Sequence, residues 1–212
     1  MSIHNQIAYL WFKRQPLNYL AHLFLSGDDA DLRLGNFIAD SVRGAQILQY
    51  PPRVQQGIRL HRLIDSFTDT HPVVAESKNR LRPTCRKYAG VVADVFYDHF
   101  LASSFHRYSP LSLPDFASAA YAQIQQHPDL LPPRVHHFLP YMVKQNWLVS
   151  YAHISGITRA LTGLSSRTSF DSGMEKAGEE LELYYPYYLR EFEQFFPELQ
   201  AYVSQQIELI RN

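Results

Sequence analysis

The apolar residues of this chain recur at intervals of three and four positions, not two. Within residues 88–104, one such stripe is formed by Val91, Val92, Val95 and Phe96, and Phe100 continues it. This spacing is typical of helices that lay one face on a core, and no segment shows the alternation of a half-buried strand. The pattern predicts an all-α protein.

Proline residues divide the pattern at helix-length intervals. Pro52 and Pro72 each suit the first turn of a helix, because proline loses no useful N–H there. The helix that begins at Pro52 is predicted to run to about Phe67, with a turn over residues 68–71.

Later helices are predicted over residues 112–127, 133–150, 153–164, 173–195 and 198–210. Pro186 should bend or break the fourth of these, and Pro197 should separate it from the last. The Ser- and Thr-rich stretch 165–172 is predicted to be a mobile loop.

Composition limits the class of protein. A chain of 212 residues that is 46% hydrophobic can bury one sizeable core, which indicates a single domain. Its 20 basic and 20 acidic side chains give no net field to attract nucleic acid or an anionic membrane. Cys85 is the single cysteine and cannot form an intramolecular disulfide, so we expect a cytoplasmic protein. The apolar stretch Ile7–Phe12 is too short to span a bilayer.

Histidine and aspartate residues are concentrated in the first half of the chain, within apolar segments. His61 and Asp65 lie four residues apart, so they share a helix face and could point at one metal ion. Asp94 and Asp98 have the same spacing, and His99 follows directly.

Two further polar residues stand among apolar neighbours upstream, His22 and Asp40. If they are buried, each needs a partner. Carboxylates mixed with imidazoles suit Mn²⁺, Fe²⁺ or Zn²⁺, and such a metal activates water and stabilises charge on a phosphoryl oxygen. The alternatives are structural: His22 as a core histidine, Asp65 paired with Arg59 or Arg62, and Asp69 as a turn cap.

Basic residues form two groups. Arg80, Arg82 and Arg86 crowd one short segment that could steer an acidic protein partner, although a solvated helix end explains them equally well. Arg43 and Arg62 lie nearer the candidate ligands and could hold a phosphate, or else form structural ion pairs.

Five segments, in this order, resemble those of the acyl carrier protein phosphodiesterases. They are Asn18–Leu25 (NYLAHLFL), Gly35–Gly44 (GNFIADSVRG), Gly57–Asp69 (GIRLHRLIDSFTD), Asp94–Leu101 (DVFYDHFL) and Asn146–Tyr151 (NWLVSY), the last followed by Gly156 and Ile157. The ordered set is much more specific than any one motif. By this resemblance, residues 1–16 precede the usual start of the family and form an N-terminal extension to a domain of residues 17–212.

The resemblance implies a divergent HD-phosphohydrolase-like helical bundle with a divalent metal, typically Mn²⁺. Its implied reaction is hydrolysis of the phosphodiester that joins 4′-phosphopantetheine to a serine of holo-acyl carrier protein, which is then a protein substrate. It places the metal at Asp40, His61, Asp98 and His99, with Asp94, Asp65 and His22 as further ligands or their neighbours. Catalytic roles are expected for Asp40, and for Asp65 or His22 as the acid that protonates the leaving oxygen.

One departure from the HD group is visible: the chain contains Asp98-His99 but no His-Asp dipeptide in that order. Two other functions stay open at this point. One is a phosphohydrolase that acts on nucleotides or small phosphodiesters, and the other is a non-catalytic helical module that binds an acidic partner.

Overall fold

The computed structural model describes residues 18–211, and it contains helices and no strand within that range. The predicted all-α class is therefore confirmed. The α-helices are α2 (Tyr19–Leu25), α3 (Ala30–Ile38), α4 (Pro52–Thr70), α5 (Pro72–Cys85), α6 (Ala89–Ser103), α7 (Leu113–Gln125), α8 (Pro133–Lys144), α9 (Trp147–Ser150), α10 (Ile154–Ser165), α11 (Ala177–Leu183) and α12 (Tyr185–Arg211). Short 3₁₀ segments are η1 (Ala39–Ser41), η2 (Gly44–Gln49), η3 (Arg86–Tyr88), η4 (Phe105–Arg107), η5 (Pro128–Leu130) and η6 (Met174–Lys176). The expected extension, residues 1–16, lies outside the described residues.

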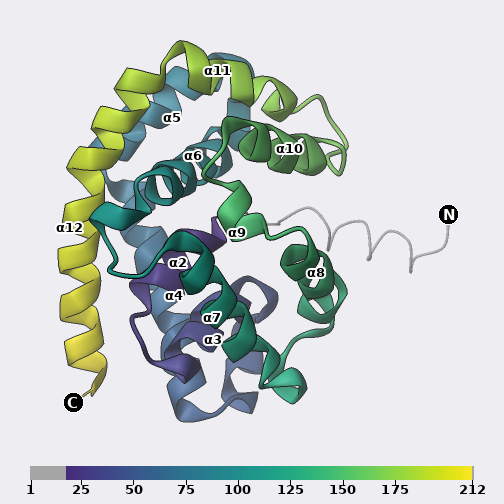
Figure 1. Ribbon diagram of the computed structural model, residues 1–212, viewed down its shortest axis with the longest axis vertical. Helices are drawn as coiled ribbons and strands as arrows, with labels where there is room; N and C mark the ends of the chain where they lie inside the picture. The colour runs from purple at the N-terminus through teal and green to yellow at the C-terminus, as the bar shows by residue number, and fades with distance from the viewer. Residues whose placement is uncertain (1–17, 212) are drawn as a thin grey trace, which may run out of the picture.

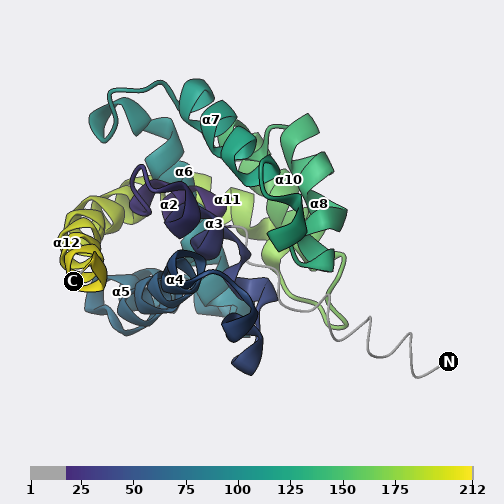
Figure 2. The ribbon, with the colours of Figure 1, turned by 90° about the horizontal axis from the view of Figure 1, so that it is seen from below.

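The helices form a bundle whose centre is occupied by α2, α4 and α6. The long α12 runs along one side of the bundle and packs on α4, α5 and α6 (Figure 1). Seen from below, α7, α8 and α10 lie on the opposite side (Figure 2). Among residues 18–211, no helix combines the length and apolar character needed to cross a bilayer.

Most predicted helix boundaries are confirmed, but α4 continues to Thr70, through most of the predicted turn 68–71, and two other boundaries are wrong. Pro52 and Pro72 do lie in the first turns of α4 and α5. The predicted single helix 133–150 is instead divided into α8 and α9 by Asn146, which adopts a left-handed conformation (φ 45°, ψ 60°). Asparagine tolerates this region better than most residues, so it can end one helix and begin another.

The second wrong boundary is at Pro197, which lies inside α12. The predicted break at Pro186 is confirmed, because α11 ends at Leu183 and Pro186 falls in the first turn of α12. A proline inside a helix costs one backbone hydrogen bond. Here the apolar face of α12 is buried on both sides of Pro197, through Phe192, Phe195, Phe196, Leu199 and Val203, and this burial outweighs the loss.

Helices α3 and α4 approach most closely at two glycines. A Cβ atom on Gly35 would lie 2.1 Å from the Val54 carbonyl oxygen, and one on Gly57 would lie 2.2 Å from that of Leu32. Neither position can carry a side chain without separating the two backbones. This contact brings the residue after Gly35, Asn36, close to the part of α4 one turn beyond Gly57.

Candidate functional site

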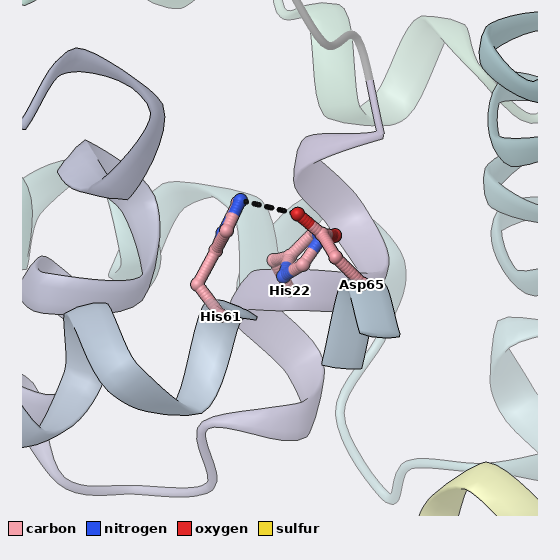
Figure 3. A group of neighbouring side chains, drawn as sticks. All are labelled: His22, His61 and Asp65. Carbon is pink, nitrogen blue, oxygen red and sulfur yellow. Dashed lines mark ion pairs between the residues drawn. The ribbon is translucent and has the colours of Figure 1, made fainter. Parts of the chain in front are cut away.

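Three side chains from two helices meet at a site where two are buried and the third, Asp65, reaches solvent. His22 comes from α2, and His61 and Asp65 come from successive turns of α4 (Figure 3). The Nε2 atoms of His22 and His61 lie 3.3 Å and 3.2 Å from the two carboxylate oxygens of Asp65. One potential ligand atom from each residue lies within 4.8 Å of the others. The group could hold a metal ion.

The two imidazole rings are held in parallel by packing. Their centroids are 3.9 Å apart with an angle of 20° between the planes, and both side chains are buried. The helical spacing of His61 and Asp65 puts both on one face of α4, as the sequence predicts. The position of His22 beside these two residues depends instead on how α2 packs in the bundle.

Asn36, which is fully buried on α3, contacts both rings from behind. Its Nδ2 donates to the backbone oxygen of His22 and to Ser26 Oγ, each at 2.9 Å. The opposite orientation of the amide would set its oxygen against the His22 carbonyl, so Oδ1 must be the atom that faces the rings. It lies 2.8 Å from Nδ1 of His22 and 3.0 Å from Nδ1 of His61.

An amide oxygen can only accept hydrogen bonds, and therefore both histidines carry their proton on Nδ1. In the neutral rings, both Nε2 lone pairs then point into the cluster, where a metal would need them. Sequence reasoning missed Asn36. The available signal was the same as for Asp40, a polar side chain among the apolar residues of Gly35–Asp40.

Asp40, in η1, extends the cluster on the side of His61. Its Oδ2 lies 3.1 Å from His61 Nε2. This oxygen is buried, and it is paired with the His61 ring, whose pKa it helps to raise. A buried carboxylate oxygen beside an imidazole nitrogen fits a cation ligand.

Without a metal, a proton supplies the positive charge. Burial alone lowers the pKa of His61, but the carboxylates of Asp40 and Asp65 outweigh burial and raise that pKa to about 10. Burial and the neighbouring His61 lower the pKa of His22. For Asp65, burial opposes ionisation, but the two histidines outweigh it and lower the pKa. The cluster thus holds the Asp65 carboxylate ionised, beside a positive charge on His61.

Comparison with known proteins gives a consistent result over most of the chain. Residues 17–199 match the family model described as acyl carrier protein phosphodiesterase. The chain belongs to this family.

Individual relatives agree with the family match. A protein of Photorhabdus laumondii named acyl carrier protein phosphodiesterase is 35% identical over 182 residues, which cover 85% of this chain and 92% of the relative. One of Serratia proteamaculans with the same name is 36% identical over 184 residues, covering 86% and 95%. One of Escherichia coli is 33% identical over 189 residues, covering 89% and 98%. No solved structure matches the chain.

Two ligands that the family resemblance implies have other partners in the structure. Asp98, fully buried in α6, accepts hydrogen bonds from the backbone N–H groups of Leu20 (2.9 Å) and Ala21 (2.8 Å). Burial raises the pKa of Asp98 to about 8, against the effect of these two donors. Asp98 thus anchors the start of α2, the helix that carries His22, and its role as a metal ligand stays a prediction.

His99 also lies outside the His22–His61–Asp65 group. Its Nδ1 is 2.8 Å from the backbone oxygen of Tyr151, and its Nε2 is 3.1 Å from the hydroxyl of Tyr185. Burial lowers its pKa. Both ring nitrogens thus link α6 to Tyr151 and to α12, and the role of His99 as a metal ligand stays a prediction.

Asp94 lies beside the cluster in a cleft between α2, α4 and α6. A pocket of about 120 Å³ is lined by Asp94 together with Asn18, Asp65, Thr68 and Asp69. Burial, followed by the charge of Asp65, raises the pKa of Asp94 well above its ordinary value. Asp94 is therefore more readily protonated than an ordinary aspartate, next to the ionised Asp65.

The arginines expected to bind phosphate lie at the surface. Arg62 is exposed on α4, and its Nη2 donates to the backbone oxygen of Val42 at 3.4 Å. Arg43 is exposed at the start of η2. Sequence reasoning missed Arg134, a partly buried residue of α8 whose guanidinium interacts electrostatically with Asp40 and Arg43.

The expected docking residues differ among themselves. The Nη1 and Nη2 atoms of Arg80 donate to Glu191 of α12, at 2.8 Å and 2.7 Å, so this residue ties α5 to α12. Arg82 and Arg86 are exposed. The hollow beside Arg86 is also lined by acidic residues, Asp171, Glu179 and Glu180, so the surface there is mixed in charge.

Proposed function

We propose that this chain is a metal-dependent phosphodiesterase that hydrolyses the bond between 4′-phosphopantetheine and the serine of holo-acyl carrier protein. Its membership of the acyl carrier protein phosphodiesterase family supports the substrate. The observation that carries the metal dependence is the convergence of two imidazole Nε2 atoms on the Asp65 carboxylate.

The ligands we assign are His22, His61, Asp65 and Asp40. Three of these residues are held by only two elements, α2 and α4, and Asn36 fixes the tautomer of both histidines. Mixed imidazole and carboxylate ligands suit Mn²⁺. When bound, such an ion supplies a Lewis acid that offsets negative charge on the phosphoryl oxygens.

The residues around the cluster would bind and orient the phosphodiester. Arg43, Arg62 and Arg134 can offset the charge of its phosphate from the side of Asp40. The leaving serine oxygen needs a proton. Asp65 cannot donate one, because its pKa is lowered and it stays ionised. We assign this donation to the carboxyl group of Asp94.

The role of Asp94 makes a prediction about pH. Because the protonated form is the active one, kcat should fall as pH rises through the raised pKa of Asp94. An Asp94→Asn variant should lose about 100-fold or more in kcat, with little change in KM, and should lack this alkaline decline. Steady-state kinetics across pH would measure both. A variant that retains the decline would assign the proton to another group.

The reaction itself can be tested on the carrier protein. Purified enzyme is incubated with holo-acyl carrier protein and Mn²⁺, and the intact mass of the carrier is followed, with EDTA and an Asp65→Asn variant as controls. We expect loss of one phosphopantetheine mass only with the wild type and metal. If the carrier stays intact with every divalent metal while free nucleotides are hydrolysed, the protein is a nucleotide phosphohydrolase. Carrier binding without any hydrolysis would indicate a binding module.

Docking of the carrier is proposed at the exposed residues Arg82 and Arg86. Reversing both charges should raise KM for the carrier about tenfold at low salt and have a smaller effect at high salt, since screened surface charges mainly steer association. The matched control is Arg107→Glu, an exposed arginine outside this segment. An equal KM in the double variant and the control would exclude docking at this surface.

A further inference from the structure

A groove lies between α9 and α10. Part of it is built from a sequence motif that contributes no residue to the metal cluster. It is lined by Gln145, Trp147, Ser150, Tyr151, Gly156, Arg159, Ala160, Gly163, Leu164 and Arg167. Three of these, Trp147, Ser150 and Tyr151, belong to the NWLVSY segment. The volume is about 150 Å³, which suits a branched group of roughly the size of benzene rather than a whole cofactor.

The wall of the groove is fixed by Gly156. A Cβ atom there would lie 2.0 Å from the carbonyl oxygen of Ser150, so only glycine lets α10 pack this closely on the end of α9. The floor is different. A Cβ atom on Gly163 would meet no atom within 4 Å, so the groove is open above this residue.

Two guanidinium groups flank that opening. Arg159 lies four residues before Gly163 on the same face of α10, and Arg167 follows the end of the helix and also lines the groove. Arg167 is also close enough to Tyr19 and Arg134 to interact with them electrostatically, and the same two residues interact with Asp40. Arg167 thus belongs to the same electrostatic neighbourhood as Asp40.

A buried donor without an acceptor lies in the same groove. Tyr151 is only 1% exposed, and its hydroxyl forms no hydrogen bond with any described residue. A buried hydroxyl that lacks a partner costs free energy, and an acceptor on a ligand bound in this groove would remove that cost.

We infer that this groove binds the pantoyl part of the 4′-phosphopantetheine arm, an inference that rests on the proposed function. The pantoyl unit is the segment next to the phosphate, and it combines a branched apolar carbon, a hydroxyl and an amide carbonyl. The phosphate lies on the side of Arg167 and Asp40, the apolar carbon packs on Trp147 and Leu164, and the carbonyl accepts a hydrogen bond from the Tyr151 hydroxyl. The groove thereby distinguishes this arm from other phosphodiesters.

Binding of 4′-phosphopantetheine to the metal-free protein, measured by calorimetry, tests the inference. Gly163→Leu places a side chain in the open space and suits a helix better than glycine, so the fold is retained; it should weaken binding more than about tenfold. Tyr151→Phe removes only the hydroxyl and should weaken binding about tenfold, with no loss of thermal stability. The matched control is Thr162→Leu, an exposed position of α10 that does not line the groove and should bind like the wild type.

The outcomes separate this inference from the proposed reaction. If Gly163→Leu and the wild type bind the compound equally, or if the wild type does not bind it, the groove is not the pantoyl site. If Gly163→Leu lowers the affinity for inorganic phosphate by the same factor as the affinity for 4′-phosphopantetheine, the groove recognises phosphate and the inference is wrong. If binding depends on the groove but the carrier is never cleaved, the inference stands and the proposed reaction fails.

Discussion

Replacing His61 with alanine is expected to lower both metal affinity and phosphodiesterase activity by more than about 100-fold. Loss of a residue that merely supports a ligand typically costs 10- to 100-fold, and His61 is itself placed to be a ligand. Its Nε2 lies 3.1 Å from Asp40 and 3.2 Å from Asp65, so its removal separates the two carboxylates from their shared partner. The control is His136→Ala, an exposed histidine of α8 that should behave like the wild type.

The same site should bind metal more tightly as pH rises. In the metal-free protein the pKa of His61 is raised to about 10 by the net effect of Asp40 and Asp65, so its ring is protonated at neutral pH. A metal must displace that proton, and affinity therefore increases as pH approaches the raised pKa. Calorimetry in buffers of different ionisation enthalpy should detect close to one proton released per metal ion at neutral pH. Two results would contradict this assignment. One is a His61→Ala protein that binds metal with unchanged affinity, and the other is a wild-type metal affinity that does not depend on pH.

The stability of the metal-free protein should follow the opposite trend. A raised pKa means that protonated His61 favours the folded state. Its contribution is complete below the ordinary histidine pKa, and it is lost progressively as pH rises towards about 10. Urea unfolding of the wild type and of His61→Ala across this range would measure the difference.

Helical periodicity was sufficient to predict the fold class and part of the site. The four-residue spacing in α4 places His61 and Asp65 on one face whatever the rest of the chain does. The same rule could not decide between Asp94, Asp98 and His99, because all three lie in α6 and the rule does not say what packs on each face. In the structure, the start of α2 donates a backbone hydrogen bond to Asp98, and the backbone oxygen of Tyr151 contacts the His99 ring.

Long-range packing explains why the sequence did not predict the role of Asn36 or the course of the last helix. Spacing cannot predict that Asn36 lies behind two rings from two other helices, since this depends on the close contact of α3 and α4 at Gly35 and Gly57. The error at Pro197 has the same origin. A local rule for proline was outweighed by the burial of aromatic side chains along α12.

Replacing Asn36 with leucine is expected to weaken metal binding about 10- to 100-fold, although Asn36 would touch no metal. The amide oxygen keeps the protons of both histidines on Nδ1. Without it, each ring is free to carry its proton on Nε2, the atom that a ligand must leave unprotonated. Asn36→Asp retains an acceptor for both rings but loses the donor to the backbone oxygen of His22, and we expect an intermediate effect.

Nitrogen-15 NMR of the histidine side chains in the metal-free protein would observe this directly. His22 is the better reporter, because its pKa is lowered and its ring is neutral at neutral pH. The wild type should show its proton on Nδ1, and Asn36→Leu should show a mixture of the two tautomers. The matched control is Ser26→Ala, which removes one acceptor of the Asn36 amide and leaves Oδ1 in place. If a folded Asn36→Leu protein keeps the Nδ1 tautomer and the wild-type metal affinity, another group orients the histidines, and the role assigned to Asn36 is wrong.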